Sequence, residues 1–234
     1  MPLPAAQKDL RKFSNKSKAK ILQKFFKTGP GEYAEGDIFM GVTVPHTREV
    51  ARRYQNLSLN ETLTLLKSTI HEERLLALLI LVSKYSNGDD KEKERIYKSY
   101  LKNAKHINNW DLVDLSADKI VGSYLMDKEK TCLYRLAKSR NLWKRRISIL
   151  ATFHFIKNNR YQETLAIAEA LLSDPEDLIH KAVGWMLREI GKRDLLVEER
   201  FLKKCYKKMP RTMLRYAIER FPELKRKAYL YGRI

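Results

Sequence analysis

Helical periodicity runs through nearly the whole chain, and this feature limits most strongly what the sequence can fold into. Apolar residues recur every three or four positions, whereas the alternation typical of a strand is confined to IFMGVTV at 38–44. Only seven prolines and nine glycines occur among 234 residues, and they cluster between the periodic segments. The sequence therefore predicts an all-α protein.

The expected helices are joined by short loops, and capping residues mark several of their starts. Ser58 and Glu61 form a capping box, and Asp174 precedes a proline at a first helical position. The predicted helices cover 4–13, 16–27, 46–55, 59–68, 71–86, 90–104, 110–126, 130–139, 142–157, 161–172, 176–191, 195–208 and 211–221. Such a series predicts stacked antiparallel hairpins, an α-solenoid without a strict sequence repeat, and we expect residues 1–234 to form one domain.

The least regular stretch is KTGPGEYAEGDIFMGVTVP at 27–45. It is rich in glycine and links the N-terminal helices to the rest of the chain. Loops of this length inside a compact domain are often functional.

The charge balance is the first indication of a partner. Lysine and arginine number 47 against 28 aspartate and glutamate residues, a formal net charge of +19. This favours a polyanionic ligand, although a basic protein without such a ligand is the alternative. The sequence has no apolar run of transmembrane length, its start is too charged for a signal peptide, and Cys132 and Cys205 form no paired motif. We therefore expect a cytoplasmic protein without a membrane segment.

Several catalytic classes lack their motifs in this sequence. GxxxxGK[ST], HExxH, the cysteine and histidine spacings of zinc sites, and GxSxG are all missing. We therefore expect no metal, no nucleotide and no other cofactor.

The helix at 176–192 has a tryptophan where a solvent-exposed residue is expected. Successive residues turn about 100° on a helix, so Lys181, Trp185 and Arg188 share one face. The opposite face is an apolar stripe of Ile179, Val183, Met186 and Ile190. Either the helix is buried on two sides, or the tryptophan face is a stacking surface flanked by phosphate-binding charges.

The helix at 142–157 carries three consecutive cations. Lys144 and Arg145 are expected to point outward, whereas Arg146 falls in an apolar sector, which consists of Ile149, Leu150 and Phe153. A guanidinium in such a sector needs a partner. A structural ion pair with a carboxylate and a phosphate contact are both consistent with this position.

The segment NNWDLVDLSADKIVG at 108–122 places three aspartates on a helix of a basic chain. Trp110 and Asp114 are four residues apart and are therefore neighbours at the edge of the expected core stripe, which comprises Val113, Ala117, Ile120 and Tyr124. Asp111 suits the helix N-terminus, where negative charge is stabilised, and Asp118 is expected to be solvated. Asp114 beside a tryptophan is better explained by a positive charge that needs stabilisation.

Cleavage of an N-glycosidic bond creates such a charge. Its transition state resembles an oxocarbenium ion, which a nearby carboxylate can stabilise while it orients the attacking water. A purine alkylated at N3 or N7 is itself cationic, and tryptophan faces attract cations by ~0.5–2 kcal/mol. Because such a base is already a good leaving group, the reaction needs no general acid.

With these residues assembled, the chain resembles the bacterial DNA alkylation-repair glycosylases of the AlkC/AlkD kind, and the AlkD type most. The resemblance covers nearly the whole chain and rests on NWDLVD (109–114), NLWKRR (141–146) and KAVGWMLRE (181–189). It implies a curved superhelix of HEAT-like antiparallel helical hairpins with a basic concave face for duplex DNA. It also implies excision of cationic lesions without flipping the base into a deep pocket.

The resemblance implies the following roles. Asp114 would stabilise the sugar cation and position water, and Trp110 and Trp185 would contact the deoxyribose and backbone around the lesion. Arg146, Arg188 and Lys181 would contact phosphates. Thr43, which replaces the glutamine of some relatives, and Arg48 would lie near the DNA backbone, and Tyr33 would correspond to an aromatic residue near the lesion.

The sequence thus predicts a monomeric DNA-alkylpurine N-glycosylase for base excision repair of double-stranded DNA, located in a bacterial cytoplasm and associated with the nucleoid when bound to DNA. Two alternatives belong to other classes. One is a non-catalytic protein that binds damaged or unusual DNA, and the other is a helical-repeat scaffold for protein interactions.

Overall fold

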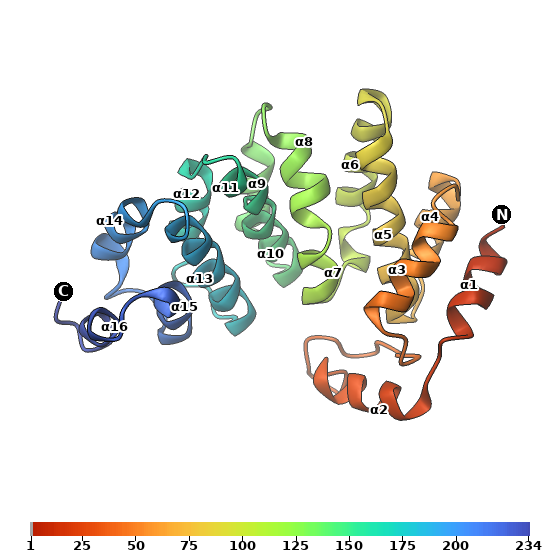
Figure 1. Ribbon diagram of the computed structural model, residues 1–234, viewed down its shortest axis with the longest axis horizontal. Coiled ribbons are helices and arrows are strands. Elements are labelled where there is room, and N and C mark those ends of the chain that lie inside the picture. Colours follow the sequence, from red (N-terminus) through yellow and green to blue (C-terminus); the bar gives the residue numbers. More distant parts are fainter. Residues whose placement is uncertain (1) are drawn as a thin grey trace. The chain divides into compact units, whose positions relative to one another are not determined.

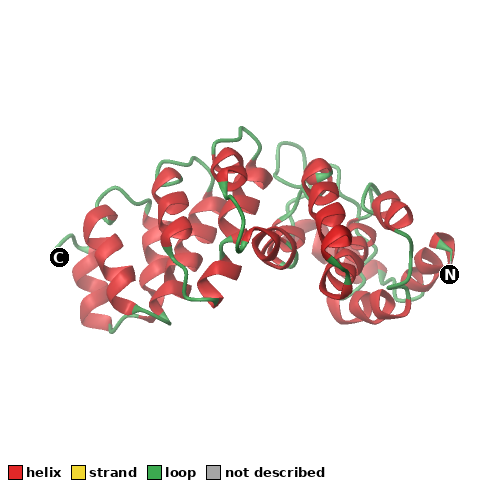
Figure 2. Ribbon diagram, turned by 90° about the horizontal axis from the view of Figure 1, so that it is seen from above, coloured by secondary structure: helices red, strands yellow, loops and turns green. Residues whose placement is uncertain are grey.

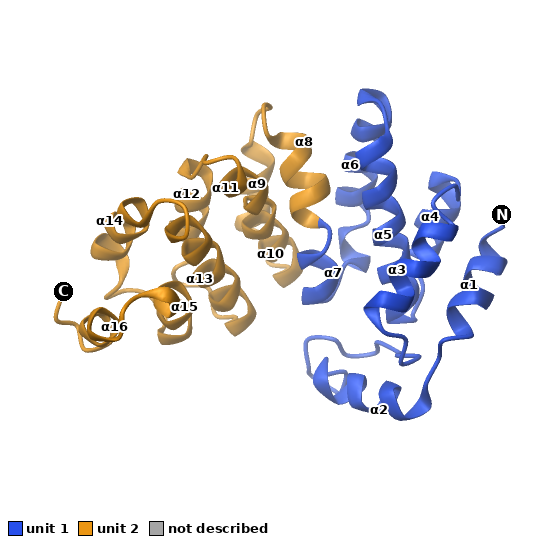
Figure 3. Ribbon diagram, viewed as in Figure 1, with its two compact units in different colours: residues 1–116 blue, residues 117–234 orange. Residues whose placement is uncertain are grey.

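The computed structural model describes residues 2–234, and the regular secondary structure of these residues is helical apart from one bridge between Ile38 and Ile70. The all-α prediction is confirmed. Two compact units, residues 1–116 and residues 117–234, are here called the N-terminal unit and the C-terminal unit (Figure 3). Figure 2 shows helices connected by loops.

The N-terminal unit is built around α5 (Figure 1). Its helices are α1 (Leu3–Arg11), α2 (Lys16–Phe25), α3 (Val44–Arg53), α4 (Leu59–Leu65), α5 (His71–Asn87), α6 (Asp90–Lys102), the 3₁₀ turn η1 (Ala104–His106) and α7 (Trp110–Asp114). Helix α5 contacts α3, α4, α6 and α7, and for this reason its sequence LLALLIL is apolar on nearly every side.

Helix α2 differs from the other helices of this unit because none of its residues is fully buried. It is amphipathic and basic, and it leaves Ile21 and Phe25 65% and 61% exposed. Phe26, the next residue, is buried and anchors the end of the helix in the unit. An exposed aromatic residue on a basic helix is a candidate for ligand contact.

The C-terminal unit is built around α13. Its helices are η2 (Asp118–Gly122, a π-helical turn), α8 (Ser123–Leu125), α9 (Thr131–Ala137), α10 (Leu142–Ala151), α11 (Phe153–Lys157), α12 (Gln162–Ala170), α13 (Asp177–Gly191), α14 (Leu195–Cys205), α15 (Arg211–Ala217), η3 (Ile218–Arg220) and α16 (Glu223–Leu230). Helix α13 contacts α10, α11, α12, α14 and α15. The predicted stripe on α13 is confirmed, because its four apolar residues are fully buried.

The π-helical turn η2 is the main departure from the predicted helices. A π turn adds one residue to the helical repeat, so the buried position moves from the predicted Tyr124, which is half-buried, to Leu125. Gly122 lies on this turn, and a Cβ atom there would collide with the carbonyl oxygen of Ala151 on α10. The glycine therefore permits the close contact between η2 and α10.

Two smaller differences from the predicted helices concern residues 142–157 and the last helix. The predicted helix at 142–157 is divided into α10 and α11 at Thr152, whose hydroxyl donates to the Ile149 carbonyl at 2.7 Å and tightens the turn. The chain also ends in a helix, α16, that the apolar pattern did not indicate.

Candidate functional site

Trp110 and Asp114 lie one helical turn apart on α7, and both side chains are half-buried. Asn109 begins the helix, and its side chain accepts a hydrogen bond from the Trp110 amide at 2.8 Å. Further along, the Ser116 hydroxyl donates to the Leu112 carbonyl at 2.6 Å and accepts from the Tyr100 hydroxyl at 2.8 Å. The predicted neighbours are therefore side by side on a short helix that is fixed at both ends.

Aromatic side chains hold the indole of Trp110. The Phe26 ring stacks on it with centroids 5.1 Å apart, and the Phe25 ring meets it edge-on at 6.0 Å. Phe26 is buried, whereas Phe25 is exposed. The resemblance implies that Tyr33 is the aromatic residue near the lesion. No sequence pattern indicates Phe25, whose position beside Trp110 follows from the fold of α2.

A buried charge network lies behind these rings. His71, the first residue of α5, places Nε2 2.8 Å from Asp111 Oδ2 and Nδ1 3.4 Å from Asp37 Oδ2. Arg74 donates to Asp37 at 2.6 Å, and Asn108 donates to it at 3.3 Å. Burial opposes ionisation of His71, but the charge and hydrogen bond of Asp111, together with Asp37, outweigh it and raise the pKa of His71.

Asp111 thus has two contacts. One of its oxygens accepts from the Leu112 amide at 2.8 Å, in the first turn of α7, where the sequence predicts a stabilised negative charge. Its other oxygen binds His71. Asp37 is also buried, and although burial favours its neutral form, His71 and Arg74 lower the pKa of Asp37.

Glu72 holds the loop at 27–45 against α5. Its carboxylate accepts hydrogen bonds from the amides of Met40 at 3.0 Å, Gly41 at 2.8 Å and Val42 at 3.2 Å. Gly41 has φ +81°, and a Cβ atom there would collide with the Asn15 carbonyl. The amides at 40–42 are thus bound to a carboxylate rather than to a neighbouring strand, which explains why the predicted strand-like alternation yields only a bridge.

We expect Glu72→Gln to lower the free energy of unfolding by ~2–3 kcal/mol, because hydrogen bonds to a buried charge are lost and an amide N–H would face the loop amides. Urea unfolding measures the loss, and hydrogen exchange of the amides at 40–42 locates it. Glu49→Gln, the same change at a surface pair with Arg53, should cost less than ~1 kcal/mol. Equal losses in the two variants would contradict this role of Glu72.

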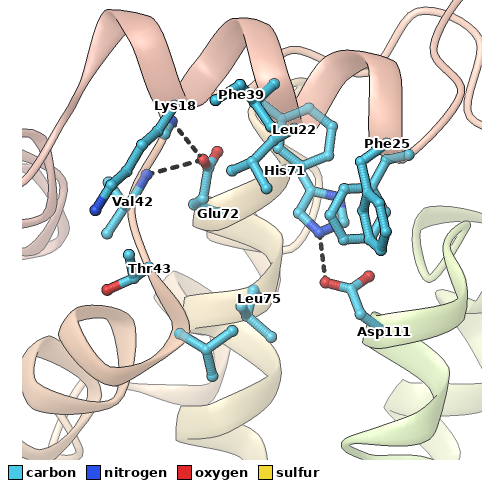
Figure 4. A pocket seen from close by; sticks show the side chains of 14 residues that line it. Lys18, Leu22, Phe25, Phe39, Val42, Thr43, His71, Glu72, Leu75 and Asp111 are labelled. Atoms are coloured by element: carbon cyan, nitrogen blue, oxygen red, sulfur yellow. Dashed lines mark hydrogen bonds and ion pairs between the residues drawn. The ribbon is translucent and has the colours of Figure 1, made fainter.

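A pocket of about 330 Å³ opens beside this network, within the N-terminal unit (Figure 4). Figure 4 shows His71 with its hydrogen bond to Asp111. Glu72, Phe25 and Phe39 line the same pocket. The lining residues come from α2, the loop at 27–45, α5 and α7, and most of them are apolar. Thr43 also lines this pocket, which places one predicted DNA-binding residue close to the aromatic cluster.

The other predicted contacts of the N-terminal unit lie near its surface. Thr43 precedes α3, and its hydroxyl is 3.1 Å from His46 Nδ1. Arg48, on the first turns of α3, is exposed. Tyr33 is half-buried in the loop at 27–45. Their contact with DNA stays a prediction.

In the C-terminal unit, Arg146 is 5% exposed and donates a hydrogen bond to the Leu178 carbonyl of α13. This contact joins α10 to α13. A phosphate contact by Arg146 stays a prediction.

Arg145 was expected to point outward, and this prediction is wrong. Its guanidinium forms two hydrogen bonds to Asp174, at 2.5 Å and 3.2 Å, and the side chain is only 11% exposed. A bidentate pair of this kind is shielded from water and rigid. Arg145 therefore links the start of α10 to the segment before α13.

Trp185 is half-buried on α13 and lies near Phe153, with ring centroids 5.7 Å apart. Its Nε1 donates to Glu189 at 3.3 Å, and Glu189 also pairs with Lys192 at 2.5 Å and Arg193 at 3.3 Å. Burial opposes the charge of Glu189, but these partners lower the pKa of its carboxyl. The tryptophan is therefore held in place by an ionised residue one turn away.

The two cations beside Trp185 also have acidic neighbours. Lys181 pairs with Asp177 at 2.8 Å, one turn earlier on α13, and Arg188 pairs with Glu219 on η3. Lys181 is 41% exposed and Arg188 is 17% exposed. Exposed pairs are weak and exchange readily with other anions, so Lys181 is the more accessible of the two.

Asp118 was expected to be solvated, and this prediction is also wrong. It is 4% exposed and accepts from Lys157 at 2.7 Å, while the Lys157 ammonium lies 4.1 Å from the centre of the Phe153 ring. The π-helical turn carries Asp118 inward. Asp118, Lys157 and Phe153 thus form a contact chain that continues to Trp185.

Trp110, Asp114 and the N-terminal contacts belong to one unit, and Arg146, Lys181, Trp185 and Arg188 belong to the other. Among residues 2–234, no three His, Cys, Asp or Glu side chains are grouped as a metal site requires. No described helix combines the length and the apolar character needed to cross a membrane.

The chain is similar to known proteins in sequence and in fold. A model of the DNA alkylation repair enzyme family matches residues 6–221. A predicted DNA alkylation repair enzyme from Enterococcus faecalis superimposes with a TM-score of 0.70 at 17% identity, over 90% of this chain and 97% of that chain. AlkD2 from Streptococcus mutans superimposes with a TM-score of 0.53 at 17% identity, over 94% and 97%. No curated protein sequence matches. At this identity, the solved structures show a common helical-repeat fold.

Proposed function

Because the chain belongs to the DNA alkylation repair enzyme family, we propose that it is a DNA glycosylase that releases N3- or N7-alkylated purines from duplex DNA. The observation that carries the proposal is the pair Trp110 and Asp114 on α7. The rings of Phe25 and Phe26 pack against Trp110, and the chain has a net charge of +19. A carboxylate next to a rigid indole in a basic protein suits a ligand that is anionic as a whole and cationic at one point.

In the proposed reaction, Asp114 stabilises the positive charge that develops on the deoxyribose as the C1′–N bond breaks. The bonding electrons pass to the alkylated base, which leaves as a neutral molecule. A water molecule oriented by Asp114 then bonds to C1′, and its proton passes to the carboxylate and on to solvent. Because the base is already cationic, no residue has to protonate it.

Trp110 and Trp185 would contact the deoxyribose and the backbone around the lesion, and the indole faces would also attract the cationic base. The buried Phe26 keeps Trp110 from turning away. Phosphate contacts are proposed for Lys181, Arg188 and Arg146. Thr43, Arg48 and Tyr33 would approach the DNA from the N-terminal unit.

We expect Phe25→Ala to weaken binding of lesion-containing duplex by about tenfold, because stacking of an aromatic side chain on a base contributes ~1–3 kcal/mol. Its exposure predicts little loss of stability. Ile21→Ala, one turn earlier on α2 and equally exposed, is the matched control. Fluorescence anisotropy with a labelled duplex measures both. Equal effects of the two substitutions would show that Phe25 has no specific contact with DNA.

A non-catalytic DNA-binding protein is the second candidate, and the high positive charge favours it equally. The two functions separate when base release and duplex binding are measured together over a range of salt concentrations. The glycosylase should bind with an affinity that falls steeply as salt rises and should release the methylated base. Salt-sensitive binding without release would support the second candidate, and absence of DNA binding would leave the protein-interaction scaffold.

We further propose that residues 1–234 work as one domain and as a monomer in the bacterial cytoplasm. Sedimentation of the protein with and without a short duplex tests the stoichiometry. A complex of one chain per duplex is expected, and a dimer on the duplex would contradict it.

A further inference from the structure

We propose that His71 is a positioning residue for the Trp110–Asp114 pair: as an imidazolium between Asp37 and Asp111, it fixes the start of α7 against the loop at 27–45. The expected effect of His71 on base release rests on the proposed function. Its structural part, the coupling of His71 to Trp110, can be tested without any activity.

The positions of the two carboxylates favour donation by both ring nitrogens of His71. His71 is 2% exposed, and its nitrogens face two carboxylates, Asp111 at 2.8 Å and Asp37 at 3.4 Å. Carboxylates only accept hydrogen bonds when ionised, and a neutral imidazole has only one N–H. A neutral His71 would therefore direct a lone pair at one of the two aspartates.

The charges around the ring are balanced when His71 is protonated. The two carboxylates face His71 and Arg74, which binds Asp37 at 2.6 Å. The neighbouring Glu72 is bound to the loop amides, and Lys18 of α2 lines the same pocket as His71. Loss of the His71 proton would leave a buried negative charge without its counterion.

Two short paths connect His71 to Trp110. The first is covalent, because Asp111, which binds His71, directly follows Trp110 in the chain. The second is a column of rings, in which the imidazole stacks on Phe39 at 4.4 Å and lies 5.2 Å from Phe26, which stacks on Trp110. Both paths lie within the N-terminal unit.

The protonation state of His71 should therefore determine how well Trp110 and Asp114 are held. A histidine whose pKa is raised on folding contributes stability that is complete below its unfolded pKa of about 6.5 and is lost as pH rises through its folded pKa. We expect single-turnover base release to fall on the alkaline side of this transition.

The test combines fluorine NMR with pH profiles on the full chain labelled with 5-fluorotryptophan. Trp110→Phe assigns the Trp110 resonance. In the wild type, this resonance should shift with a single midpoint above about pH 6.5, and the shift should disappear in His71→Gln. His154→Gln, a change at a half-buried histidine of the C-terminal unit, should leave the transition unchanged.

Asp111→Asn removes one of the two charges and should move the midpoint to lower pH, for the Trp110 resonance and for base release alike. His71→Gln should slow release by about 10- to 100-fold, as expected when a catalytic group loses its alignment, and should abolish the alkaline decline. A loss of thermal stability alone would not move a pH midpoint, so the shift separates positioning from folding.

A Trp110 resonance that does not respond to pH, or that still titrates in His71→Gln, would overturn the inference. So would an Asp111→Asn variant with the midpoint of the wild type. If the wild type releases no base but the Trp110 resonance titrates as expected, the glycosylase proposal fails and the coupling of His71 to Trp110 stands.

Discussion

Asp114→Asn is expected to slow the release of N7-methylguanine or N3-methyladenine from duplex DNA by at least ~100-fold. Removal of a single group that stabilises transition-state charge typically costs 10²–10³ in rate. Asparagine keeps the size of the side chain but is neutral, so it cannot balance the developing sugar cation. Single-turnover release with enzyme in excess measures the effect on the chemical step.

Duplex affinity of Asp114→Asn should stay within a few-fold of the wild type, or rise, because one negative charge near the DNA has been removed. Asp127→Asn is the matched control, since Asp127 is exposed and pairs with Arg160 at the surface. We expect its rate of release to equal that of the wild type. A similar rate in Asp114→Asn would remove Asp114 from the mechanism.

Glu198→Gln is expected to stabilise the protein, by an amount that grows with pH. Glu198 is 1% exposed on α14, and its Oε1 has no hydrogen-bond partner among residues 2–234. Burial, and then the charge of Glu199, raise the pKa of Glu198 to about 8. The folded protein therefore holds a proton that the unfolded chain releases near pH 4.5.

The higher pKa of Glu198 in the folded state determines how stability changes with pH. Between pH 4.5 and about pH 8 the folded state binds more protons at this group, so stability falls as pH rises through that window. With about 1.4 kcal/mol for each pKa unit, the cost of Glu198 at higher pH has an upper limit of about 5 kcal/mol. Glutamine has the same shape and no charge, and we expect it to recover ~2–3 kcal/mol at pH 8.5.

Thermal unfolding at several pH values measures this gain, at ~2–4 °C for each kcal/mol in a chain of this size. The difference between Glu198→Gln and wild type should be near zero at pH 5 and largest above pH 8. Glu169→Gln, at an exposed pair with Lys204, should show no such growth. A difference that is independent of pH would contradict the neutral form of Glu198.

Much of the fold could be predicted because it depends on local pattern. Helical periodicity and caps such as Ser58 with Glu61 give most helix positions, and the stripe on α13 is buried as predicted. The π-helical turn could not be predicted in the same way. It depends on contacts of Gly122 and Asp118 with residues of α10 and α11 that are ~30–40 positions away in the chain.

Only the local part of the candidate site could be predicted from the sequence. The spacing of Trp110 and Asp114 is a local property, and it survives in α7. The residues that surround this pair come from distant segments: Phe25 from α2, Asp37 from the loop and His71 from α5. The sequence signal for the network is the run HEER at 71–74, whose four polar residues precede the apolar run LLALLIL and are all buried.

Buried polar residues of this kind are informative because each one needs a partner. Glu73 accepts from Gln7 at 3.0 Å and Ser68 at 2.7 Å, and Glu72 and His71 bind the loop and α7. The first turn of α5 therefore connects α1, the loop at 27–45 and α7. A run of charged residues before an apolar stretch can thus indicate a buried polar network that joins several segments.

The most direct test of the proposed activity uses a duplex with a single N7-methylguanine and an excess of the wild-type protein. We predict free methylated base and abasic sites in equal amounts, with the abasic sites detected as strand breaks after mild alkali. Retention of the modified base in the DNA would contradict the proposal. So would the appearance of unmodified guanine in place of abasic sites, because it would show removal of the methyl group instead of hydrolysis of the N-glycosidic bond.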